Sequence, residues 1–172
     1  GLALLREDVK RAVAEAASPT LDLPRRVLDA PTDADEVCAK LKAIRDAQRP
    51  VGYDIEGTVD AGITVCSLST TPNFALSISF KRLDWSPVWS KDDELGIGMD
   101  LRAVLEDPAV PKVMHNAAYE MFVHRWLHGH QIRNVEDTML AWHVLYPELL
   151  KDLSVVASVL TRQPYWGAPG DW

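Results

Sequence analysis

The chain has 172 residues, of which 47% are hydrophobic and 25% are charged, a composition typical of one soluble globular domain with a sizeable core. Its formal net charge of −7 argues against a protein that coats nucleic acid by bulk electrostatics, but a nuclease is not excluded, because a metal-dependent site is itself acidic. No apolar run reaches the length of a membrane span, and the N-terminus lacks the pattern of a signal peptide, so we expect no membrane association.

The first part of the chain is predicted to be helical. Residues 4–17 predict a short helix, and Pro24 lies in the break that follows it. A second helix is predicted after the capping residue Asp33, with an apolar stripe at Val37, Leu41 and Ile44. We therefore expect an N-terminal helical segment, residues 1–49, and a second domain, residues 50–172.

Three strands are predicted next, over residues 51–56, 61–70 and 74–80. The last of these alternates large apolar and small side chains with a period of two. The short connections between them, such as Thr71-Pro72-Asn73, predict an antiparallel meander.

The rest of the chain is predicted to alternate between helices and strands. A polar connection over residues 84–94 leads into a helix near residues 99–105. The later predictions are strands over 112–116 and 135–138 and helices over 117–127, 138–145 and 153–160. Three antiparallel strands followed by strand–helix units describe an α/β domain with a mixed sheet.

Asp54 and Glu56 end the first strand at positions i and i+2. Alternate residues of a strand share a face, so the two carboxylates point the same way. Like charges repel, and a hard divalent cation with oxygen ligands is the usual reason for keeping them together. The alternative is a solvated strand end with two unrelated charges.

A second group of polar residues lies where the strand over 112–116 meets the next helix. Asn116 can cap that helix, and Glu120 in its first turn can interact with the helix dipole. Neither explanation accounts for the combination of this acid, one turn after the end of a strand, with Asp54 and Glu56 at the end of an earlier strand. Glu120 is therefore a third candidate metal ligand.

These residues carry a family resemblance. Asp54-Ile55-Glu56 resembles the first motif of the DEDD (DnaQ-like) 3′→5′ exonucleases, and residues 116–120 resemble the second motif, N-x-x-[YF]-D, with Glu120 in the usual Asp place. Asp137-Thr138-Met139-Leu140 is similar to the strand–helix entry that follows in proofreading domains of family A DNA polymerases. The resemblance covers about residues 51–165 and is greatest to the bacteriophage type.

The resemblance implies a ribonuclease H-like fold and a proofreading activity that hydrolyses the terminal phosphodiester of DNA 3′ ends. It implies two divalent cations, Mg²⁺ or Mn²⁺, bound by the catalytic residues Asp54, Glu56 and Glu120. Asp137 is expected either to support these ligands indirectly or to cap the helix that begins at Thr138. The implied substrate-binding residues are Gly57, Thr58, His115, Asn116 and Tyr119.

One part of the family pattern is missing. The fourth carboxylate should follow a Tyr or His on a late helix, but Tyr146 and Tyr165 have no acid at that spacing, and Pro147 interrupts the interval between His143 and Glu148. The last eight residues predict an outward loop. We therefore expect a C-terminally truncated domain with weak or no exonuclease activity by itself.

Other conspicuous side chains have structural explanations. The apolar helical positions of Trp126, Met139 and Trp142 predict core residues. Three histidines without a cysteine or a fourth ligand favour a polar helix end over a zinc site: His124, His128 and His130.

The leading interpretation is a proofreading exonuclease that acts on single-stranded or frayed DNA 3′ ends, with a polymerase domain downstream in the parent chain. The bacteriophage resemblance implies a viral origin. One alternative is a stand-alone RNA exonuclease similar to ribonuclease D, and another is a non-catalytic nuclease-like binding or structural module. Cys38 and Cys66, with neither zinc-like spacing nor a disulfide framework, favour a cytoplasmic protein, in the host cytoplasm if viral.

Overall fold

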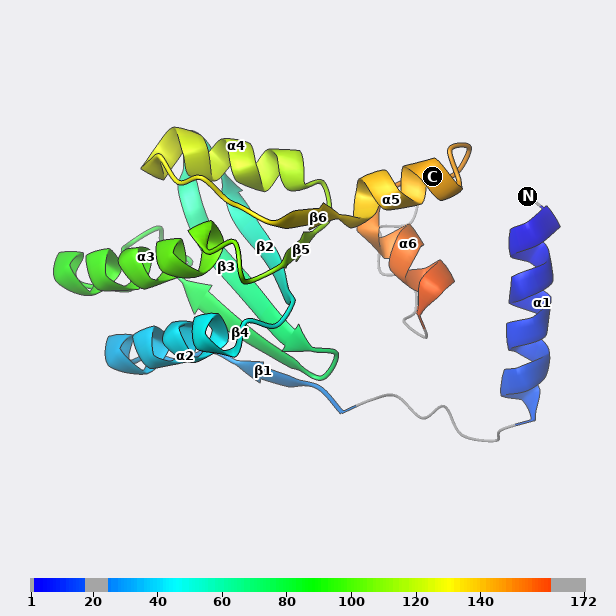
Figure 1. Cartoon of the computed structure of the whole chain (residues 1–172). Coiled ribbons are helices and arrows are strands. Elements are labelled where there is room, and N and C mark those ends of the chain that lie inside the picture. The colour runs from blue at the N-terminus through cyan, green and yellow to red at the C-terminus, as the bar shows by residue number, and fades with distance from the viewer. Residues whose placement is uncertain (1, 18–24, 162–172) are drawn as a thin grey trace. The chain divides into compact units, whose positions relative to one another are not determined.

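The computed structural model describes residues 2–17 and 25–161 (Figure 1). The chain divides into two compact units, one of residues 26–140 and one of residues 1–25 with residues 141–172. The first unit holds the sheet and also the helix predicted after Asp33. The compact units therefore divide at positions other than the 49/50 boundary expected from the sequence.

A six-stranded mixed sheet organises residues 26–140, in the order β1-β4-β3-β2-β5-β6. Strands β2, β3 and β4 form the predicted antiparallel meander, while β5 and β6 extend the sheet in parallel beside β2. The strands are β1 (Val27–Asp29), β2 (Val51–Thr58), β3 (Gly62–Thr71), β4 (Phe74–Ser79), β5 (Lys112–Met114) and β6 (Val135–Asp137). The predicted α/β class is confirmed.

Two elements differ from the sequence-based expectation. Strand β1 was not predicted; it is three residues long, and its pairing with β4 is parallel and therefore not local. Helix α3 (Lys91–Glu106) begins well before residue 99. The Ser90 side chain accepts a hydrogen bond from the Asp93 backbone N–H, 3.2 Å away, which is a helix-capping signal within the stretch predicted to be a connection.

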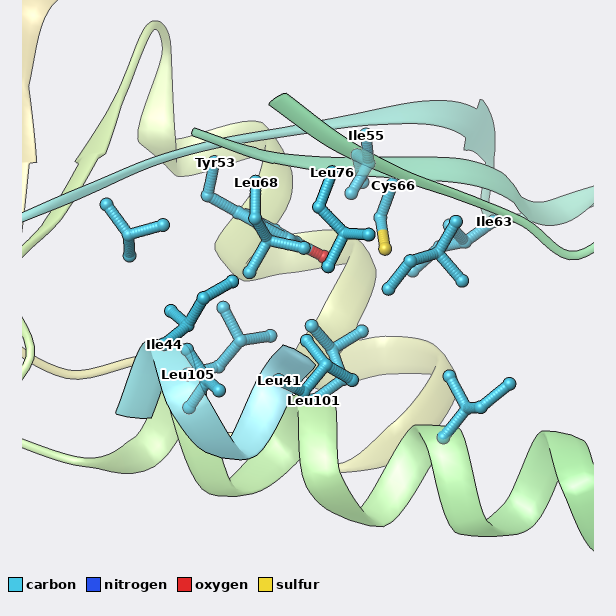
Figure 2. Packing of buried hydrophobic residues seen from close by; sticks show 14 of the residues in the cluster. Leu41, Ile44, Tyr53, Ile55, Ile63, Cys66, Leu68, Leu76, Leu101 and Leu105 are labelled. Carbon is cyan, nitrogen blue, oxygen red and sulfur yellow. The ribbon is translucent and has the colours of Figure 1, made fainter. Parts of the chain in front are cut away.

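The core lies between the sheet and the helices α2 (Ala34–Ala47) and α3. Figure 2 shows side chains of Tyr53, Leu68 and Leu76 pointing from the strands toward leucines and an isoleucine of the two helices. The predicted stripe of Val37, Leu41 and Ile44 is buried there, and Asp33 caps α2 as predicted. This packing leaves the opposite face of β2 for polar residues.

The second unit contains α1 (Leu2–Ala16), the end of α5 (Thr138–Leu145) and α6 (Leu153–Leu160). The Arg11 guanidinium donates hydrogen bonds to the carbonyl oxygens of Ser158, Val159 and Thr161, which would otherwise be unpaired at the end of α6. None of the helices in residues 2–17 and 25–161 is long and apolar enough to cross a lipid bilayer.

The predicted core aromatics have different outcomes. Trp142 is buried, as predicted, and its indole N–H donates to the Leu150 carbonyl oxygen at 2.9 Å. Met139 is half-buried. The prediction for Trp126 is wrong, because this side chain on α4 (Ala117–His128) is 70% exposed. A helical apolar position shows which residues share a face, but not whether another element covers that face.

Candidate active site

Strand β2 separates the core from the two carboxylates. Val51, Tyr53 and Ile55 are buried, whereas Asp54 and Glu56, at the alternate positions of the strand, are exposed on the other face. The protein around the Asp54 carboxyl still removes enough water to raise its pKa, an effect that the Ile55 backbone N–H and His115 oppose. The predicted shared face of the two acids is therefore present.

Gly57 lies at an irregularity where β2 and β3 change register. Its φ is +143°, and an added Cβ would lie 2.2 Å from the Gly62 carbonyl oxygen, so no other residue fits there. The next residue, Thr58, accepts a hydrogen bond from the Ala61 backbone N–H at 3.1 Å. Both residues thus shape the turn directly after the acids, independently of the substrate-binding roles predicted for them.

Asn116 occupies the N-cap position of α4 but does not cap it with its side chain. Its backbone is left-handed, with φ 70°, a conformation that Asn tolerates better than most residues. The exposed side chain is not used by the helix, so the alternative explanation of Asn116 as a side-chain cap does not hold.

Asp137 fulfils this capping function and caps a second helix as well. Its carboxylate accepts hydrogen bonds from the Asn116 and Ala117 backbone N–H groups, at 3.2 and 2.9 Å, where α4 begins. It also accepts from the Met139 and Leu140 N–H groups, at 2.8 and 3.2 Å, where α5 begins. The predicted cap of α5 is confirmed, and the cap of α4 is an additional finding.

We expect Asp137→Ala to lower the free energy of unfolding by roughly 2–4 kcal/mol, because each lost N-cap costs about 1–2 kcal/mol and this side chain caps two helices. Urea denaturation at neutral pH measures the change. Glu136→Ala, at the exposed neighbouring position on β6, is the matched control and should have little effect. Equal losses in the two variants would contradict the double-cap role.

Glu120 is the most unusual residue of the site. It is only 3% exposed, and its Oε2 is the one buried side-chain polar atom without a hydrogen-bond partner in the described part of the chain. Burial, and then the charges of Asp54 and Asp137, raise its pKa to about 7. An unpaired buried carboxyl oxygen is costly, and an ion that the structure does not contain is one of the standard explanations.

The donor set fits a hard divalent cation, because Asp54, Glu56 and Glu120 offer only oxygens. Asp54 and Glu120 lie close enough for the charge of one to affect the pKa of the other, and Glu56 shares a strand face with Asp54. Within the described ranges, however, no three His, Cys, Asp or Glu side chains already form a group that could hold a metal. Mutual repulsion opposes such convergence in the absence of a cation.

His115 and Tyr119 flank the acids. The Thr138 hydroxyl donates its single proton to the Met114 carbonyl oxygen at 2.9 Å, so the contact of 2.9 Å between Thr138 Oγ1 and His115 Nδ1 must be a hydrogen bond donated by the ring. In the neutral ring, Nε2 is then the acceptor nitrogen. The Tyr119 hydroxyl donates to the Gly57 carbonyl oxygen at 2.6 Å, which ties the first turn of α4 to the end of β2.

The three histidines of α4 and the following loop are not arranged as a zinc site. His124 Nε2 lies 2.6 Å from the Tyr53 hydroxyl, and its Nδ1 lies 3.2 Å from His130 Nδ1. Burial lowers the pKa of His124 to about 3 and that of His130 to about 4, so both rings are neutral. His124 and His130 therefore form a buried polar network with Tyr53, whereas His128, the last residue of α4, is exposed at the predicted polar helix end.

Residues 26–160 match the sequence profile of a family described as 3′-5′ exonuclease. No curated protein sequence matches the chain.

Solved structures with a similar fold include those of RRP6, NrnC and Pol1. The catalytic core of RRP6 from Trypanosoma brucei has a TM-score of 0.61 and 18% identity, covering 86% of this chain and 38% of that one. NrnC from Brucella melitensis bound to pGG has a TM-score of 0.57 and 16% identity, covering 88% and 67%, and another structure of NrnC contains Mg²⁺. The POL domain of Pol1 from M. smegmatis, in complex with DNA primer-template and dNTP, has a TM-score of 0.58 and 24% identity, covering 76% and 22%. The chain thus spans well under two thirds of the RRP6 and Pol1 structures. At these sequence identities the similarity shows the fold alone, and that fold agrees with the predicted ribonuclease H-like architecture.

Proposed function

The chain belongs to the 3′-5′ exonuclease family, and from this membership we propose that it hydrolyses the terminal phosphodiester of single-stranded or frayed DNA 3′ ends with the help of two divalent cations. Glu120 is the observation that carries the proposal. Its buried, unpaired carboxyl oxygen lies near two further acids, which is unfavourable in a protein that binds no cation.

Asp54, Glu56 and Glu120 would hold the cations, either Mg²⁺ or Mn²⁺. When bound, such cations polarise the scissile phosphate and lower the pKa of a coordinated water. Asp137 contributes indirectly: by capping α4 it fixes the start of the helix that carries Glu120, one turn further on. This role of a positioning residue agrees with its four backbone contacts.

The substrate-binding roles follow from exposure and donor chemistry. The exposed Asn116 side chain is not engaged in capping, so its amide is suited to hydrogen bonds with the terminal nucleotide. His115 directly precedes Asn116 and is proposed to contact the same nucleotide through its polar ring. Tyr119 offers a ring for stacking, and Gly57 and Thr58 form the turn beside it.

The parent protein is proposed to be a family A DNA polymerase of the bacteriophage type, in which this domain removes misincorporated nucleotides before a downstream polymerase domain continues. This assignment rests on the motif resemblance. Both cysteines are free thiols, which is compatible with a reducing cytoplasm.

We expect the 3′ end to be degraded faster when it is single-stranded or mismatched than when it is paired. Melting one terminal base pair costs about 1.4 kcal/mol of stacking, so a mismatched end should be cut about tenfold faster than a matched end. The measurement compares rates on matched, mismatched and single-stranded 5′-labelled DNA and on an RNA oligonucleotide, in Mg²⁺ and in Mn²⁺.

The outcomes separate the alternatives. Faster cleavage of RNA than of single-stranded DNA would favour a ribonuclease D-like enzyme. Oligonucleotide binding with neither hydrolysis nor binding of Mg²⁺ or Mn²⁺ would favour a non-catalytic module, because weak hydrolysis alone is what we expect of this chain. Asp54→Ala controls for contaminating nucleases.

A further inference from the structure

The outer face of α4 carries three aromatic side chains in a row. Tyr119, Phe122 and Trp126 are spaced i, i+3 and i+7 and therefore lie along one flank of the helix. They are 39%, 54% and 70% exposed, and the Phe122 and Trp126 ring centroids lie 6.1 Å apart. The buried face of the same helix is formed by Ala117, Glu120, Val123 and His124. We call the three exposed rings the aromatic stripe.

The aromatic stripe begins at the candidate active site. Tyr119 directly precedes Glu120, and its hydroxyl contacts the Gly57 carbonyl oxygen, one residue after Glu56. From Tyr119 to Trp126 the helix axis advances about 10 Å. Stacked nucleotides advance about 3.4 Å along a strand, so the stripe matches two or three nucleotides.

The charge of this face suits a phosphate backbone. Glu120 is the only acid in α4, and it is buried, whereas Arg125 is exposed next to Trp126. By contrast, the first turns of α2 and α3 carry acids on a chain of net charge −7. An approaching DNA strand would meet aromatic rings and a guanidinium on α4 (the yellow-green helix of Figure 1), but no carboxylate.

We propose that the aromatic stripe is a stacking track for single-stranded DNA, which holds the two or three nucleotides that precede the terminal one. The inference rests on the proposed function and extends its binding site along α4. Aromatic rings accept every base, so the track supplies affinity that depends on strand length and is insensitive to sequence.

The test measures binding of (dT)2 and (dT)8 to the 172-residue chain by calorimetry in EDTA, which prevents hydrolysis. We expect wild type to bind (dT)8 more tightly than (dT)2. Because loss of one stacking ring weakens binding by roughly tenfold, Phe122→Ala combined with Trp126→Ala should weaken (dT)8 binding by about 100-fold and leave (dT)2 binding unchanged. Phe122→Tyr combined with Trp126→Tyr should restore it.

Trp85→Ala is the matched control, since Trp85 is also an exposed tryptophan, at 63%, but lies outside α4. It should leave both affinities unchanged. Equal (dT)8 binding by wild type and the double alanine variant would overturn the track, as would no binding of (dT)8 by wild type. A double alanine variant with a lowered melting temperature and equally weakened (dT)2 binding would also overturn it, because the rings would then be packing residues. Tighter binding of (rU)8 than of (dT)8 would overturn the commitment to DNA.

Failure of the track and failure of the proposed function give different results. Wild type that degrades DNA 3′ ends, with the double alanine variant unimpaired in (dT)8 binding, contradicts the track alone. Length-dependent binding that requires the rings, with neither hydrolysis nor binding of Mg²⁺ or Mn²⁺, contradicts the metal-dependent exonuclease activity alone.

Discussion

Asp54→Ala is expected to weaken Mn²⁺ binding by about 100-fold or more and to abolish DNA hydrolysis. Loss of a group that merely supports a metal ligand costs 10–100-fold in affinity or activity, and loss of a ligand itself should cost at least as much. Isothermal titration calorimetry with Mn²⁺ measures the affinity, and degradation of labelled single-stranded DNA measures the activity.

Asp60→Ala provides the control for the charge change, because Asp60 is an exposed acid in the turn between β2 and β3. It should bind Mn²⁺ like wild type. Unchanged Mn²⁺ affinity in Asp54→Ala would remove Asp54 from the ligand set and with it the basis for the metal site.

Glu120→Gln is expected to stabilise the cation-free protein above pH 7 while weakening its Mn²⁺ binding. The folded state holds the Glu120 proton up to a pKa of about 7, whereas the ordinary value is 4.5. Between these two values the folded state binds more protons than the unfolded state, so stability falls as pH rises from about 4.5 to about 7. The difference corresponds to about 3 kcal/mol at most, which the neutral glutamine should recover in part.

Urea denaturation in EDTA at pH 5 and pH 8 tests this expectation. Wild type should lose stability between the two pH values relative to Glu120→Gln, and Mn²⁺ at pH 8 should restore stability to wild type but not to the variant. Glu136→Gln, which changes an exposed acid, should follow wild type. Parallel pH profiles of wild type and Glu120→Gln would show that the buried carboxyl is not strained by its surroundings.

Much of the fold around the site follows from local patterns. The alternation of β2 correctly places Asp54 and Glu56 on the face opposite Tyr53 and Ile55, because side-chain direction in a strand depends only on sequence position. The start and buried stripe of α2 were equally predictable, since a capping Asp33 and helical periodicity are local signals. The short β1 has no such signal, because its position depends on parallel pairing with the distant β4.

The exposure of Trp126 shows the limit of periodicity. The sequence places it on the apolar side of a helix, but no element of residues 26–140 covers that flank. Burial depends on which elements pack together, and that is a property of the assembled domain rather than of the helix.

The sequence by itself determined the candidate acids Asp54, Glu56 and Glu120 and the order of strands and helices that carries them, because these are encoded at short range. Only the tertiary structure decided the state of the acids. Glu120 is buried near Asp54, with Oε2 unpaired, because α4 starts at the end of β5, and β5 pairs with β2. Asp137 reaches the start of α4 because β5 and β6 pair with Met114 opposite Asp137. Pairings of this kind join residues far apart in the chain, and desolvation and repulsion arise only once they form.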